Sequence, residues 1–286
     1  MFGVVVDSHQ SWWADRVVHS VFDPLHLDGV GNYWRIVLAS LVFHVALFRA
    51  TPMVSRAVVP RVFGRLGAAE QEAWCVSVTT MVHSVTDVAF VVAYFGEPAI
   101  NADRMGGYSA GLEWWLAVAM GYYTWDLAVC LADYGKYGAM YLVHAGLGVA
   151  GLAILLSRQL QYFALPYLLP EASSVFLHVR ALLKLAGLSH TLAYKANFVL
   201  FLVAYVCIRI GYEAHQSWLL VVEVWHGRTA GAYRPFAVFF AVLGVTLTVL
   251  NLIWFRQIIN AAYHTLAPRN KTLGSSKPGS KGRRSD

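Results

Sequence analysis

The sequence predicts an all-α fold, a polytopic transmembrane helix bundle with six to seven spans. Of its 286 residues, 58% are hydrophobic and only 13% are charged, whereas a soluble domain carries about 25% charged residues. The mean hydropathy is +0.52, and seven apolar stretches approach the roughly 20 residues with which a helix crosses a bilayer. One bundle accounts for the chain, because neither an internal repeat nor an extramembrane domain is visible.

The apolar stretches give the predicted spans in chain order. They cover residues 33–50, 74–95, 112–132, 137–157, 162–188, 196–222 and 235–261. The first is short, but Arg35 and Arg49 can extend their charged ends to the membrane surface. Pro166 and Pro170 interrupt the fifth stretch, which is predicted to be either a broken span or a re-entrant segment packed among neighbours. The number of spans therefore stays at six or seven.

The charges between the spans predict the orientation. The 51–73 connection contains Arg56, Arg61 and Arg65, and six cations follow Pro268 in the C-terminal tail. Cytosolic loops are rich in Lys and Arg, so this connection and the C-terminus are expected in the cytosol. Residues 1–32 would then form a non-cytosolic segment, 33–262 the bundle, and 263–286 a disordered basic tail. Three arginines in later connections oppose this orientation.

Composition and motifs also indicate which partners to expect. The three cysteines lie in apolar runs without metal-ligand spacing, and the chain has no Walker loop, GxGxxG motif or histidine box. We therefore expect no metal and no cofactor. A basic tail beside a membrane is typical of weak contact with anionic lipids, not of a nucleic-acid module. Membrane lipids are the expected partners, and the oligomeric state does not follow from the sequence.

Polar residues inside the second and third spans indicate a bundle interior. A carboxylate in hydrocarbon costs roughly 2.5–3.5 kcal/mol or more, so Asp126 is expected to face inward. His83, Asp87, Thr80 and Ser84 share one helical face. His83 and Asp87 could hydrogen-bond as in general-base pairs, or the face could be a polar stripe that joins helices.

The remaining spans contribute further interior candidates. His144 in the fourth span is followed by glycines that allow close helix packing; it is either a satisfied interior group or a catalyst. Arg209 and Glu213 are spaced i, i+4 and can pair within the sixth helix. The full set predicted to line a polar interior or lipid cavity is His83, Asp87, Tyr122, Asp126, His144, Glu171, Arg180, Asn197, Arg209 and Asn251.

Six short segments carry a recognisable series of polar residues. They are WCVSVTTMVHS at 74–84, GYYTWDL at 121–127, YLVHAGLG at 141–148, LLPEASSVFLHVRALL at 168–183, KANFVLFLVAYVCIRI at 195–210 and LNLIWFRQII at 250–259. In this order they resemble the TLC domain family, which includes the translocating-chain-associated membrane protein and the ceramide synthases. The resemblance covers residues 70–262 and is nearer to the TLC-domain-containing branch than to the ceramide synthases.

The resemblance implies a lipid-related role, and one departure bears on catalysis. Ceramide synthases carry an adjacent histidine pair, which is thought to serve acyl transfer from acyl-CoA to a sphingoid base. Here the second position is Ala145, beside His144. We therefore favour a protein of the endoplasmic reticulum that binds or senses lipid and affects membrane lipid homeostasis without catalysis of its own.

Two alternatives stay open. The first is a ceramide-synthase-like N-acyltransferase of sphingolipid metabolism, in which His144 and Asp126 would be catalytic and acyl-CoA a further partner. The second is a lipid transporter or cargo receptor, which the broken fifth span would suit.

Overall fold

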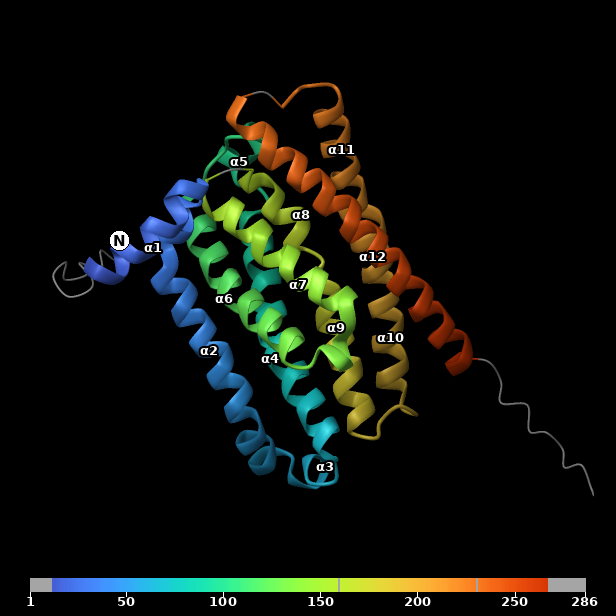
Figure 1. Ribbon diagram of the computed structural model, residues 1–286. Coiled ribbons are helices and arrows are strands. Elements are labelled where there is room, and N and C mark those ends of the chain that lie inside the picture. The colour runs from blue at the N-terminus through green and yellow to red at the C-terminus, as the bar shows by residue number, and fades with distance from the viewer. Residues whose placement is uncertain (1–11, 159, 230, 267–286) are drawn as a thin grey trace, which may run out of the picture. The chain divides into compact units, whose positions relative to one another are not determined.

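The computed structural model describes residues 12–158, 160–229 and 231–266 of the chain, and these form helices without any β-strand (Figure 1). The α-helices are α1 (Trp12–Phe22), α2 (Asp28–Val58), α3 (Pro60–Phe63), α4 (Ala68–Tyr94), α5 (Pro98–Ala102), α6 (Ala110–Ala132), α7 (Tyr134–Leu156), α8 (Ala164–Leu168), α9 (Glu171–Leu185), α10 (Leu192–Ala204), α11 (Ala214–Trp225) and α12 (Arg234–Leu266). A π-helix (Tyr205–Glu213) joins α10 to α11, and three short 3₁₀ turns cover Asp23–Leu25, Gln161–Phe163 and Gly231–Tyr233.

Six helices of the described residues are long and apolar enough to cross a membrane. They are α2, α4, α6, α7, the continuous run Leu192–Trp225 and the stretch Arg234–Asn260 of α12. Each coincides with one of the predicted spans, so the prediction of a polytopic helical bundle is confirmed.

The fifth predicted span is broken into two short helices. Leu169 and Pro170 separate α8 from α9, since the proline ring supplies no N–H for a continuous helix. Figure 1 shows α8 and α9 following one another from the end of the bundle that carries α5 toward the end where the chain turns into α10. At the first of these ends, the Leu160 N–H donates to the Met105 carbonyl. The segment is thus a broken pass through the bundle and not a re-entrant loop.

The bundle is packed around α6. Helices α2 and α7 contact α6, while α4 packs against α9 and α9 against α10. The apolar core runs through α6, α7, α8 and the first part of α12, with Leu116, Leu156, Phe163 and Phe240 at most 1% exposed. These buried side chains fill the interior of the bundle. The apolar residues left exposed on the outer faces are those that a bilayer would cover.

The chain divides into two compact units, Met1–Asn251 and Leu252–Asp286. The described part of the second unit is the C-terminal portion of α12, residues 252–266. The helix thus continues beyond residue 262, where the predicted tail begins. The remainder of that tail, from residue 267, and residues 1–11 lie outside the described residues.

A glycine on α6 sets how closely α2 can approach. A Cβ atom on Gly121 would lie 2.5 Å from the Ser40 Cβ and from the Val37 carbonyl oxygen. Gly121→Ala should therefore separate the two helices and lower stability by about 1–3 kcal/mol, as overpacking does. Thermal unfolding of the detergent-purified protein measures this effect. Gly146→Ala is the matched control, because a Cβ there meets nothing within 4 Å; equal losses in both variants would contradict the close approach.

Candidate functional site

A stripe of polar side chains on α4 forms the first part of a buried site. Thr80, His83, Ser84 and Asp87 are all buried, and Ser84 and Asp87 have no exposed surface. The His83 Nε2 lies 3.1 Å from the Asp87 Oδ2. The spacing i, i+3, i+4, i+7 therefore identified one interior face of this helix correctly.

Helix α6 supplies partners for this stripe. The Trp115 indole N–H donates to the Asp87 Oδ1 at 2.8 Å. The Tyr122 ring stacks on the His83 imidazole with centroids 3.6 Å apart, and the Tyr122 hydroxyl donates to the Thr80 Oγ1 at 3.2 Å. Both carboxylate oxygens of Asp87 thus have a close nitrogen, which a carboxylate within a membrane interior requires.

Glu171 connects three helices at the start of α9. It is 8% exposed, and it accepts hydrogen bonds from the Ser84 hydroxyl on α4 at 2.5 Å and from the Tyr123 hydroxyl on α6 at 3.4 Å. The break at Pro170 places this carboxylate at the first turn of a helix, where the helix dipole favours negative charge. Glu171 was predicted as an interior residue; its partner Tyr123 was not.

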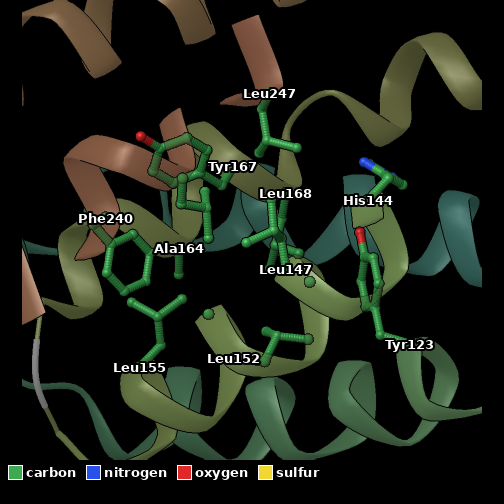
Figure 2. Close-up of a pocket in the computed structure, with 13 residues that line it drawn as sticks. Tyr123, His144, Leu147, Leu152, Leu155, Ala164, Tyr167, Leu168, Phe240 and Leu247 are labelled. Atoms are coloured by element: carbon green, nitrogen blue, oxygen red, sulfur yellow. The ribbon is translucent and has the colours of Figure 1, made fainter. Parts of the chain in front are cut away.

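Tyr123 also faces a cavity between α6, α7, α8 and α12. The cavity has a volume of about 50 Å³ and is partly open. Most of its walls are aliphatic or aromatic side chains, including Leu147, Leu152, Leu168 and Phe240. Figure 2 shows Tyr123 and His144 beside one another at one end, and Phe240 toward the other end, with the leucines between them. The cavity lining is thus mainly apolar, with Tyr123 and His144 at one end and Tyr167, whose hydroxyl contacts the Ser217 hydroxyl at 3.1 Å, toward the other (Figure 2).

His144 lies at the same end as Tyr123 because α7 approaches α6 closely. Gly148, one turn after His144, lies against the Tyr123 ring, and a Cβ atom there would come within 2.7 Å of Tyr123 Cδ1. The absence of a side chain at Gly148 therefore lets Tyr123 reach the cavity beside the imidazole.

Asp126 is not brought together with His144. It does not line the cavity, although it is near enough to Glu171 and His83 for their charges to act on it. Among the residues that the structure describes, it forms neither a hydrogen bond nor an ion pair. Tyr123, three residues earlier on α6, is the side chain that stands beside His144 (Figure 2). The catalytic pair considered from the sequence is therefore not formed.

Arg209 lies in a second polar group at the break before α9. Its guanidinium donates to the Ser173 and Ser174 hydroxyls at 2.8 and 3.0 Å and to the Pro170 carbonyl at 3.3 Å. These contacts tie the π-helix to the first turn of α9. The Pro170 carbonyl also accepts from the Ser173 N–H and the Ser173 hydroxyl at 3.0 and 2.8 Å, so Arg209 adds a contact from outside α9 to this turn.

The predicted Arg209–Glu213 ion pair is wrong. No such pair occurs within the described part of the chain; instead the Asn251 side chain lies between them, accepting from Arg209 at 3.4 Å and donating to Glu213 at 3.2 Å. The reason is the π-helix Tyr205–Glu213, whose i→i+5 turns no longer align residues four apart.

Asn197 and Arg180 lie outside the cavity, as do all the other predicted interior residues except His144. The Asn197 amide donates to the Phe176 carbonyl at 2.8 Å and so joins α10 to α9. The Arg180 guanidinium lies over the Phe198 ring at 4.8 Å. Neither lines the cavity. We find no cluster of three or more potential metal ligands among residues 12–158, 160–229 and 231–266.

Glu113 is a buried carboxylate that sequence reasoning missed. It has no exposed surface, and it accepts hydrogen bonds from Tyr33, Tyr108 and Arg158. The hydrogen bond to Glu113 raises the pKa of the Tyr108 phenol and also that of the Arg158 guanidinium. An acidic residue in the first turn of a helix is ordinarily exposed, so its position gave no signal. These contacts join helix α2, the loop before α6 and the loop after α7 to the first turn of α6.

Comparison with known proteins agrees with this architecture. The family model of the TLC domain matches residues 73–260. The chain belongs to the TLC domain family. This match coincides with the resemblance drawn from residues 70–262, and it covers every span except the first.

Relatives within the TLC domain family are similar over most of their length. An uncharacterized TLC domain-containing protein of Schizosaccharomyces pombe is 22% identical over 249 residues, which are 86% of this chain and 84% of the relative. Protein CLN8 of Mus musculus is 28% identical over 260 residues, 87% of each chain. TLC domain-containing protein 1 of Gallus gallus is 28% identical over 203 residues, 68% of this chain and 80% of the relative.

The hydrogen bond from Trp115 to Asp87 can be tested by substitution. Trp115→Phe keeps an aromatic ring to stack on Phe90 but leaves a buried carboxylate oxygen without its donor, which costs about 1–3 kcal/mol. Thermal unfolding should show this loss. Trp114→Phe, at a neighbouring position that is 50% exposed, should change stability little. The same small change in both variants would contradict the role given to the Trp115 indole.

Proposed function

We propose that this TLC-domain protein binds a single lipid chain in the cavity between α6, α7, α8 and α12. The observation that carries the proposal is the lining of that cavity, which is mainly apolar and places the Tyr123 and His144 side chains together at one end. Ligand sites are mostly apolar and contain a few convergent polar groups. An amphiphile with one chain matches this arrangement.

The length of the cavity supports binding of one extended lipid chain. The cavity follows α7 from His144 to Leu155, eleven residues that span about 16 Å at 1.5 Å per residue. Half of a hydrocarbon core of roughly 30 Å has a similar length. The volume of about 50 Å³ excludes a complete two-chain phospholipid, and entry of a single chain would require the lining side chains to move apart.

The biological setting follows from the family together with this cavity. The protein would sense or hold lipid in an internal membrane, the endoplasmic reticulum, and influence membrane lipid homeostasis without its own catalysis. The basic 51–73 connection and the C-terminus would face the cytosol. Epitope tags at the C-terminus, tested for access after selective permeabilisation of the plasma membrane, check this orientation.

Filling the cavity tests lipid binding. Leu152→Phe enlarges a side chain that lines the cavity and is 3% exposed, so it should exclude the bound chain. Lipids carried through purification are quantified by mass spectrometry. We expect the lipid enriched with the wild-type protein to fall several-fold in this variant, because the two volumes overlap.

Val143→Phe is the control for that experiment. Val143 lies on the same helix but is 45% exposed and does not line the cavity. The enriched lipid should remain with this variant. If Leu152→Phe retains the lipid as well as Val143→Phe does, the lipid is bound elsewhere and the proposal fails.

An acyltransferase is the second candidate, because the His144 side chain faces the cavity (Figure 2). General-base chemistry also needs an oriented partner for the imidazole, and Asp126 does not provide one. Under the binding proposal, purified protein incubated with acyl-CoA and a sphingoid base should form no N-acyl product. Product that forms, and is lost on His144→Ala, would replace the binding proposal with an enzyme.

A further inference from the structure

The end of α2, α3 and the following turn carry an unusual concentration of positive charge. Residues 49–65 contain four arginines and no acidic residue. We name the set Arg49, Arg56, Arg61 and Arg65 the arginine elbow. All four are exposed. Within the described residues, none of them forms a salt bridge.

The acidic residues that follow the arginine elbow are engaged elsewhere. The Glu70 carboxylate accepts from the Gly67 backbone N–H at 3.0 Å and caps the start of α4. The Glu72 carboxylate is 2.9 Å from the Lys136 ammonium. The elbow therefore presents its charge outward without compensation from these neighbours.

Exposed apolar residues alternate with the arginines. Met53, Val54 and Val58 are 70%, 53% and 73% exposed. The other face of α2 contains the buried Thr51 and Ser55, which turn toward the bundle. Aliphatic side chains beside cationic ones are typical of a segment at the boundary between hydrocarbon and lipid headgroups.

The elbow is held in a fixed shape. Phe63 is completely buried and packs against the Trp74 ring with centroids 6.2 Å apart. The Trp74 indole N–H donates to the Ser55 hydroxyl at 3.1 Å, and the Gln71 amide donates to the Leu66 carbonyl at 3.0 Å. The backbone that carries the arginines is thus ordered before any ligand arrives, which lowers the entropic cost of binding.

We propose that the arginine elbow is a binding site for anionic phospholipids, whose phosphate groups the exposed guanidinium groups contact while Met53, Val54 and Val58 lie against the acyl chains. Guanidinium groups bind phosphate oxygens through paired hydrogen bonds. Clusters of four or more cations directly beside a membrane span attract anionic lipids. The site lies apart from the cavity and goes beyond the proposed function.

The test uses the full chain reconstituted into phosphatidylcholine vesicles that contain a trace of acceptor-labelled lipid. Energy transfer from the protein's tryptophans reports enrichment of labelled phosphatidylserine over labelled phosphatidylcholine at the protein. Arg61→Gln with Arg65→Gln should reduce this enrichment by about fivefold per arginine at low salt, because each cation near the surface contributes about 1 kcal/mol. Higher salt should reduce it in the wild type.

Two further variants make the result decisive. Arg228→Gln with Arg234→Gln removes the same charge from two exposed positions, one after α11 and one at the first residue of α12, and should leave most of the enrichment. Arg61→Lys with Arg65→Lys should restore part of it. Equal losses of enrichment in the two Gln pairs would show a general charge effect and overturn the proposal. Enrichment that survives the elbow substitutions in a folded, monodisperse protein would also overturn it.

Discussion

The need to pair the carboxylates of Asp87 and Glu171 within the membrane interior determines much of this structure. A carboxylate in hydrocarbon is costly unless it is paired or hydrogen-bonded. Glu171 meets this requirement through Ser84 and Tyr123, and Asp87 through Trp115 and His83. Because these partners come from α4, α6 and α9, the polar contacts fix how the helices face one another. Apolar packing alone gives little orientation where the surrounding solvent is equally apolar.

The break in the fifth pass links this polar interior to the cavity. Pro170 ends one helix and begins another, so Glu171 lies at a helix start in the middle of the bundle. Tyr123 donates to Glu171 and also lines the cavity. Arg209 holds the broken backbone through the Pro170 carbonyl. The end of the cavity at Tyr123 and His144 therefore depends on an irregular backbone that a continuous helix would not provide, which is tolerated because protein surrounds it.

Hydropathy and helical spacing predicted the spans and the α4 stripe, because both depend on residues of one local segment. The partners of the polar residues depend on how distant helices pack, and the sequence did not reveal them. Tyr123 is an uncharged aromatic residue within an apolar span, so nothing in the sequence singled it out, and Glu113 resembles an exposed helix-start acid. The predicted Arg209–Glu213 pair assumed an α-helix, whereas the chain forms a π-helix there. Asp126 was considered as a possible partner of His144 because it lies on the preceding span, but Tyr123 is the residue of that helix that lines the cavity beside His144.

Occupation of the cavity by a lipid chain can be tested directly. Membranes that contain the protein can be incubated with a long-chain fatty acid carrying a terminal diazirine, irradiated, and digested for peptide mapping. We expect label on the cavity-lining residues of α7 and α8, such as Leu152 and Leu168. Label confined to outward-facing positions, such as Val42 and Val45 on α2, with none in the cavity, would contradict this occupation.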